Sequence, residues 1–128
     1  MALPRVLVVD DEAATRKGLS ELLTDAGYAC TAVESFQEAN DIAQVNPPDL
    51  LITDIRLKGY NGLQLVFRFP DLPAIVMTGY ADKVLEREAT RAGATYIRKP
   101  LNVNELLQLV RHKLLDKTAE RHEQNNGD

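Results

Sequence analysis

A short apolar run that ends on a carboxylate constrains this chain most. Segment 49–54 follows two prolines, contains two leucines and an isoleucine in succession, and ends at Asp54 before a glycine-containing loop. An apolar run without polar alternation is typical of a strand covered on both faces, as parallel strands are. Because such sheets bind ligands beyond the carboxyl ends of their strands, Asp54 stands where chemistry is expected. A strand-ending Asp that merely starts a turn explains this stretch alone equally well.

The order of the remaining patterns indicates the fold class. Apolar runs typical of strands alternate with segments that have helical spacing of apolar residues. The predicted strands are 5–9, 28–33, 49–54, 74–78 and 95–98. The predicted helices are 12–26, 35–44, 63–69, 82–92 and a last one that begins after Asn102 and reaches about Leu114. Strictly alternating strands and helices predict an α/β fold, a parallel sheet in a three-layer (βα)5 sandwich with right-handed crossovers.

Local signals support the helix boundaries. Ser35 precedes Glu38 by three residues, and Asn102 precedes Glu105 in the same way, so both pairs form capping boxes. Asp82 is a third N-cap candidate. The predicted third helix has room for only about two turns before the next proline. The segment between Asp54 and this helix is predicted to be a loop because of its glycines.

Length and charge narrow the class of protein. At 128 residues the chain fits one domain, predicted over 1–116, with a polar C-terminal tail or linker remnant over 117–128. A net charge of −4 argues against direct nucleic-acid binding by this domain. No apolar stretch approaches the roughly 20 residues of a membrane span, and the amino terminus lacks a signal-peptide pattern, so no membrane contact and a cytoplasmic location are expected. Cys30 is the only cysteine and is predicted to be a small core residue.

Polar side chains stand at the ends of four predicted strands. Asp10, Asp11, Asp54, Thr78 and Lys99 each lie at or just after the last apolar residue of a strand. Since parallel strand ends meet at one edge of the sheet, three carboxylates, a hydroxyl and an ammonium are expected in one crevice. Clustered carboxylates repel, and a hard divalent cation relieves that repulsion. Mg²⁺ fits best, because calcium loops and zinc sites need ligand spacings or His and Cys residues that this edge lacks.

These residue types suit the formation of an aspartyl phosphate. Asp54 is the candidate nucleophile. Mg²⁺ and Lys99 would neutralise charge on the transferring phosphoryl oxygens, and the Thr78 hydroxyl would donate a hydrogen bond to one of them.

In these motifs the chain resembles a response-regulator receiver domain of the CheY-like superfamily, the phosphoacceptor part of two-component signalling. The similarity covers about residues 4–116. The matching segments are 8–12, 51–54, Gly62, 76–79 and 96–100, in family order. The resemblance implies a flavodoxin-like sheet with strand order 2-1-3-4-5. It also implies a signalling domain that is not an enzyme beyond its own phosphorylation and dephosphorylation.

The resemblance assigns roles at the acidic edge. It implies that Asp54 accepts a phosphoryl group from the phosphohistidine of a histidine kinase or phosphotransfer protein. Asp11 is expected to bind Mg²⁺ directly and Asp10 mainly through water, with Asp54 and the backbone carbonyl of Arg56 completing the protein ligands.

The resemblance also implies a switch. Thr78 is expected to move toward the phosphoryl group while the Tyr96 ring turns inward, and a cis peptide is expected before Pro100. The fourth helix, last strand and last helix are the expected partner surface, with a homodimer through that face as one possibility.

The sequence departs from the family pattern at two places. Lys58 stands where the family usually has proline, and the interval from Gly62 to Pro70 is shorter than usual by about a helical turn. The active residues themselves are intact.

Two other functions remain open at this point. A phosphate-independent scaffold would keep the fold and dock partners regardless of Asp54. A hydrolase with an aspartyl-phosphate intermediate would need a second acid or base after the nucleophile, a position that Arg56 occupies.

Overall fold

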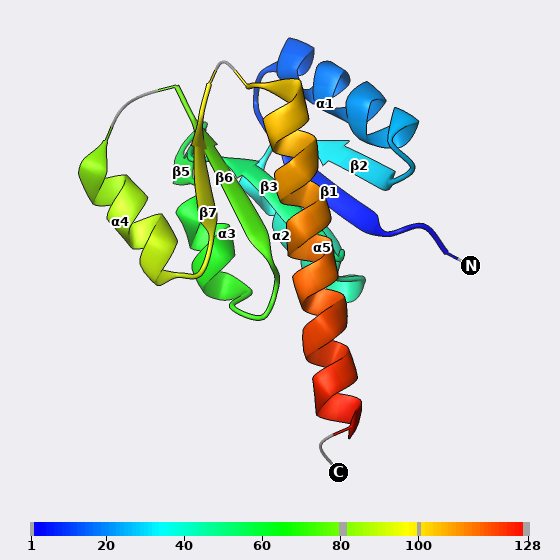
Figure 1. Cartoon of the computed structure of the whole chain (residues 1–128). Coiled ribbons are helices and arrows are strands. Elements are labelled where there is room, and N and C mark those ends of the chain that lie inside the picture. Colours follow the sequence, from blue (N-terminus) through cyan, green and yellow to red (C-terminus); the bar gives the residue numbers. More distant parts are fainter. Residues whose placement is uncertain (1, 80–81, 100, 127–128) are drawn as a thin grey trace.

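The computed structural model describes residues 2–79, 82–99 and 101–126 (Figure 1). Its strands are β1 (Arg5–Val9), β2 (Ala29–Val33), β3 (Leu50–Asp54), β4 (Arg56–Leu57), β5 (Tyr60–Asn61), β6 (Ala74–Thr78) and β7 (Thr95–Arg98). Its helices are α1 (Ala13–Asp25), α2 (Phe36–Val45), α3 (Leu63–Arg68), α4 (Lys83–Arg91) and α5 (Val103–Asn126).

A five-stranded parallel sheet forms the centre of the structure. Its strand order is β2-β1-β3-β6-β7, which confirms the predicted order 2-1-3-4-5 because β6 and β7 are the fourth and fifth strands of the prediction. The register pairs Val9 with Thr53, Asp54 with Met77, and Thr78 with Arg98. The carboxyl ends of β1, β3, β6 and β7 therefore lie next to one another.

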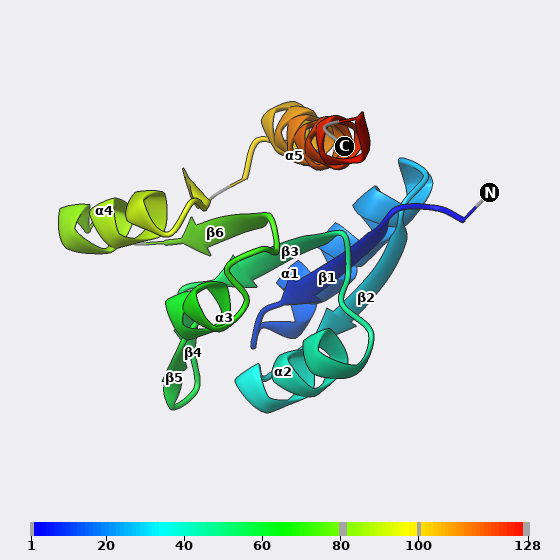
Figure 2. The same ribbon diagram turned by 90° about the horizontal axis from the view of Figure 1, so that it is seen from below.

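Helices cover both faces of the sheet, which makes three layers. Figure 2 shows α5 on one side of the sheet and α2 and α3 on the other. One apolar cluster joins α2, α3 and α4 to alternate strand residues such as Leu7, Leu51 and Val76. The second cluster joins α1 and α5 to the intervening residues, such as Val8 and Ile52. Because both faces are packed, β3 and β6 are buried along their whole length, as the unalternating apolar runs predicted.

The predicted helix caps are present. The Ser35 hydroxyl accepts from the Glu38 amide at 3.2 Å, and Asn102 Oδ1 accepts from the Glu105 amide at 3.0 Å. Asp82 Oδ1 accepts from the first amides of α4, including that of Val84 at 3.0 Å. Each side chain satisfies a backbone donor that the first helical turn leaves unpaired.

The edge strand β2 holds the single cysteine. Cys30 is half-buried and packs against the cluster under α1 and α5, in agreement with the predicted packing role. Burial raises the pKa of its thiol, and a hydrogen bond with Ser20 partly offsets that effect.

Two regions differ from the sequence-based expectation. The predicted loop after Asp54 contains a small antiparallel hairpin, β4–β5, in which Leu57 pairs with Tyr60. Gly59 has a φ of 73°, the left-handed conformation that such a tight connection requires. The last helix does not end near Leu114: α5 continues to Asn126 and extends past the sheet (Figure 1). The division into a domain over 1–116 and a tail over 117–128 stays a prediction.

Within the part of the chain that the structure describes, no helix has the length and apolar character needed to cross a membrane.

Candidate functional site

The predicted site residues lie at the carboxyl edge of the sheet. Asp54 and Thr78 are the last residues of β3 and β6. Asp10 and Lys99 follow the last residues of β1 and β7 directly. Neighbouring parallel strands therefore bring these strand ends to one edge of the sheet.

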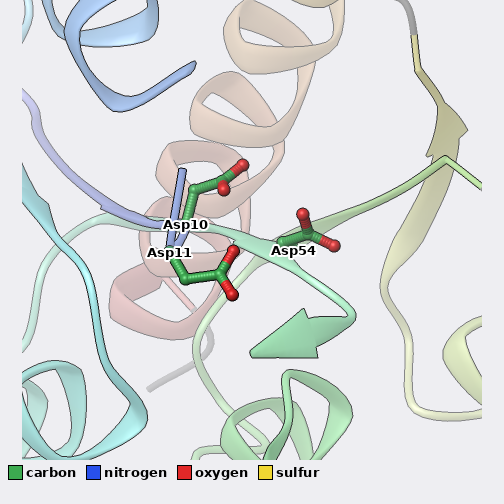
Figure 3. A group of neighbouring side chains, drawn as sticks. All are labelled: Asp10, Asp11 and Asp54. Carbon is green, nitrogen blue, oxygen red and sulfur yellow. The ribbon is translucent and has the colours of Figure 1, made fainter. Parts of the chain in front are cut away.

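The three carboxylates form a compact group. Asp10, Asp11 and Asp54 each offer an oxygen within 4.8 Å of the others. Figure 3 shows the Asp10 and Asp11 side chains leaving consecutive positions after β1 on the side where Asp54 lies. Asp10 is fully buried, Asp11 is half-buried, and the Asp54 side chain keeps 12% of its surface exposed. Asp54 is therefore held inside the edge of the sheet yet remains accessible from outside.

Lys99 links two of these acids. Its Nζ donates to Asp54 Oδ2 at 2.7 Å and to Asp10 Oδ2 at 2.9 Å. Burial of the ammonium acts to lower the pKa of Lys99, but its hydrogen bonds to Asp54 and Asp10 and their negative charges outweigh burial and raise that pKa. The lysine is a lasting positive charge at neutral pH. The three carboxylates still outnumber this single ammonium, which favours a further cation.

Backbone amides orient the remaining oxygens. Asp10 Oδ1 accepts from the Glu12 amide at 2.9 Å, and Asp54 Oδ1 accepts from the Arg56 amide at 3.1 Å. The carboxylates of Asp10 and Asp54 are thus each held on both oxygens, one by a backbone amide and one by Lys99. This arrangement reduces the freedom that a ligand would otherwise have to remove.

Gly62 is required by close packing. A Cβ at this position would collide with the carbonyl oxygen of Asp54 and lie 2.8 Å from Thr53 Oγ1. The Gly62 amide also donates to the carbonyl of Ile55 at 2.7 Å. The glycine therefore allows the chain after the hairpin to return directly against the end of β3.

The predicted switch residues, Thr78 and Tyr96, lie on the strands β6 and β7. Thr78 is buried at the end of β6, and its carbonyl accepts from the Lys99 amide at 2.7 Å. Tyr96 is half-buried in β7 and packs against the apolar cluster under α2, α3 and α4. Pro100, with its predicted cis peptide, lies outside the described residues.

Two features near the site were missed by sequence reasoning. Arg16 on α1 donates through Nη1 to the backbone carbonyl of Asp10 at 2.8 Å, and its Nη2 lies 3.8 Å from Glu34 Oε2. The second feature is the contact between the β4–β5 hairpin and α2, where Tyr60 stacks on Phe36. A glycine between Leu57 and Tyr60 was a usable signal for the hairpin, whereas the partner of Arg16 has no signature in the sequence.

The donor set fits Mg²⁺. All three side chains are carboxylates, and hard cations of this kind prefer oxygen ligands and tolerate a site completed by water and phosphate oxygens. The excess of negative charge at the edge supports the same conclusion.

Comparisons with known proteins agree with the fold. The sequence pattern of the response regulator receiver domain matches residues 6–111. The DNA-binding transcriptional regulator NtrC of Klebsiella pneumoniae is 39% identical over 108 residues, which are 80% of this chain and 23% of NtrC. The photosynthetic apparatus regulatory protein RegA of Cereibacter sphaeroides is 36% identical over 117 residues, covering 88% of this chain and 61% of RegA.

A solved structure gives the same result. The CheY-like response regulator receiver domain protein of Methanospirillum hungatei superposes with a TM-score of 0.87 at 29% identity, covering 93% of this chain and 99% of that one. The chain spans about a quarter of the length of its NtrC relatives.

The chain therefore belongs to the response regulator receiver domain family. It is a receiver domain of two-component signalling, a family in which an aspartate is phosphorylated and Mg²⁺ is bound. Receiver domains are signalling domains and not enzymes of the usual kind.

Proposed function

We propose that Asp54 is the phosphoacceptor of this receiver domain and takes its phosphoryl group from a phosphohistidine of a histidine kinase or phosphotransfer protein. One observation carries the proposal: the partly exposed Asp54 carboxylate lies within 4.8 Å of two other acids and 2.7 Å from Lys99 Nζ. A carboxylate that merely ends a strand has no need of such surroundings. The proposed compartment is the cytoplasm.

The transfer step is a displacement at phosphorus. A carboxylate oxygen of Asp54 forms the new P–O bond while the P–N bond to the donor imidazole breaks. The electron pair of the broken bond stays on the imidazole nitrogen, which then takes up a proton. Lys99 Nζ and the Thr78 hydroxyl donate hydrogen bonds to the phosphoryl oxygens as their charge develops.

Mg²⁺ belongs to this proposal as the cofactor. Asp10, Asp11, Asp54 and the backbone carbonyl of Arg56 would hold it. When bound, it supplies positive charge that stabilises the phosphoryl oxygens. Lys99 stays between Asp10 and Asp54 and keeps both carboxylates in place.

The signal is proposed to pass from the acidic edge of the sheet to the face formed by α4, β7 and α5. Thr78 moves toward the phosphoryl group, and the half-buried Tyr96 ring turns inward. As a result, the α4–β7–α5 face changes its contacts with a partner or with a second copy of the chain. The packing of Tyr96 against the cluster that includes Leu85 and Ala89 of α4 supports this route. Beyond its own phosphorylation and dephosphorylation the domain turns over no substrate.

The experiment is incubation with a small phosphodonor and Mg²⁺, followed by intact mass spectrometry. We expect a gain of one phosphoryl group that hydroxylamine removes and that EDTA prevents. The Asp54→Asn variant should show no gain. An unmodified wild type, or an equal gain in Asp54→Asn, contradicts the proposal.

A further inference from the structure

The first turn of α2 touches the hairpin that follows Asp54. The rings of Phe36 and Tyr60 lie 4.8 Å apart between centroids with an interplanar angle of 10°. Phe36 is the first residue of α2, directly after the Ser35 cap, and Tyr60 is the first residue of β5. We call this pair the aromatic latch. Tyr60 is 52% exposed, so the contact buries this residue only in part.

The latch holds the free end of the hairpin. At the base of the hairpin, Leu57 is buried and the Gly62 amide bonds to the Ile55 carbonyl. At the tip, Lys58 and Gly59 are exposed. A hairpin with two residues per strand is not stable alone and needs packing against another element. The stacked rings connect its exposed end to α2.

The hairpin in turn fixes the backbone beside the phosphoacceptor. Arg56 pairs with Asn61, the neighbour of Tyr60, and the Arg56 amide bonds to Asp54 Oδ1 at 3.1 Å. Asn61 is tied to α3, because its Oδ1 accepts from the Leu63 amide at 2.8 Å. The segment that carries Arg56 is therefore held from two sides, by α3 through Asn61 and by α2 through the latch.

We propose that Phe36 and Tyr60 are positioning residues for the acidic site, because their stacking holds the Arg56 backbone against Asp54. This inference rests on the proposed function, in which the Arg56 carbonyl contributes to Mg²⁺ binding. Without the latch the hairpin tip moves, the Arg56 amide leaves Asp54 more often, and the site is complete for a smaller fraction of the time. A ligand's apparent affinity falls in proportion to that fraction.

The test is a double-substitution cycle read by calorimetric titration with Mg²⁺ alone. Phe36→Leu and Tyr60→Leu should each weaken Mg²⁺ binding by about three- to tenfold, equivalent to about 0.7–1.4 kcal/mol at 1.4 kcal/mol per tenfold. The double variant should lose no more than either single variant, because either change already breaks the pair. Tyr60→Phe keeps the stacked ring and should bind as the wild type does.

The matched control is Phe67→Leu. Phe67 is 56% exposed on α3 and stands outside the latch, so this variant should bind Mg²⁺ normally. Losses in Phe36→Leu and Tyr60→Leu that multiply in the double variant would overturn the inference, as would an equal loss in Phe67→Leu.

A second measurement needs neither metal nor phosphate. In metal-free protein, the backbone amide of Arg56 should exchange with deuterium about three- to tenfold faster in Tyr60→Leu than in the wild type, while the amides of the β3 core stay unchanged. Unchanged Arg56 exchange refutes the latch. Faster exchange together with an unphosphorylated wild type refutes the role of Asp54 and leaves the latch standing.

Discussion

The two edges of the central sheet balance charge in different ways. At the amino edge, Arg5 donates to Asn46 Oδ1 and the Asn46 carbonyl, both at 2.8 Å, and to the Pro47 carbonyl at 3.1 Å. Its amide donates to Asp49 Oδ2 at 2.8 Å. At the carboxyl edge, by contrast, three acids surround one ammonium.

This difference between the edges distinguishes an edge with a structural role from an edge that is suited to bind a ligand. The cation of the amino edge is met by a neutral amide and two backbone carbonyls, and that edge closes the ends of β1 and α2 without any ligand. At the carboxyl edge the three clustered carboxylates outnumber the Lys99 ammonium, and a bound cation would balance the remaining negative charge. Clustered charges around a lysine whose pKa is raised are typical of functional sites. We therefore expect ligands to act on one edge and leave the other unaffected.

The largest effect on folding stability is expected from adding a side chain at Gly62, where the carboxyl edge has no space for one. Gly62→Ala places a Cβ against the Asp54 carbonyl, and the backbone has to move, which we expect to destabilise the fold by about 3 kcal/mol. Urea denaturation measures this loss. Gly18→Ala is the control, because Gly18 is exposed on α1 with open space around it, so this change should stabilise by about 0.5–1 kcal/mol. Equal stability of Gly62→Ala and wild type would contradict the close approach.

Removing the ammonium should have the next largest effect. Lys99→Met leaves buried Asp10 and Asp54 without their shared cation and should cost about 2 kcal/mol in metal-free protein. Added Mg²⁺ should restore part of that stability, because it supplies positive charge at the same spot. The measurement is urea denaturation with and without Mg²⁺. A loss that Mg²⁺ leaves untouched would show that the two cations do not share an edge.

The acidic edge was predictable because it follows from strand order alone. Asp10, Asp54 and Lys99 sit at strand ends, and parallel topology brings such ends together whatever the packing details. The hairpin is not predicted by alternation, since two residues per strand give none, although the glycine between Leu57 and Tyr60 is a usable turn signal. The Phe36–Tyr60 contact cannot be predicted before the hairpin, because the hairpin brings Tyr60 to α2.

The predicted end of the last helix, near Leu114, is wrong for a different reason, because α5 continues to Asn126. The apolar pattern stops at Leu115, and the loss of this pattern predicts the end of the helix there. Residues 117–126 include Lys, Ala, Glu, Arg and Gln, which favour helix by their intrinsic propensity. Apolar periodicity reports burial against a core, whereas backbone propensity continues beyond the core.

A smaller loss is expected at the amino edge. Arg5→Met removes hydrogen bonds to groups that water reaches after the change, so the expected cost is about 1 kcal/mol. Mg²⁺ should stabilise this variant as much as it stabilises the wild type, and the phosphodonor should modify it fully. Mass spectrometry and denaturation on the same samples check both. A weaker Mg²⁺ response in Arg5→Met would remove the contrast between the edges.

The smallest expected effect is that of pH on the stability that Lys99 contributes. The pKa of Lys99 is raised above its ordinary value of 10.5, so its contribution is complete below that value and is lost only as pH rises through the raised pKa. The stability difference between wild type and Lys99→Met should stay constant from about pH 7 to 9. Denaturation at several pH values tests this. A difference that shrinks within that range would mean that the ammonium loses its proton there.

The most direct test of the acidic site is the stability of wild type and Asp11→Asn measured as Mg²⁺ is added. At a concentration one hundred times the dissociation constant, wild type should gain about 2.7 kcal/mol. Asp11→Asn, which keeps the Lys99 bonds to Asp10 and Asp54, should gain far less at the same concentration. Equal gains in the two proteins, or no gain in wild type, would contradict a magnesium site built from these three carboxylates.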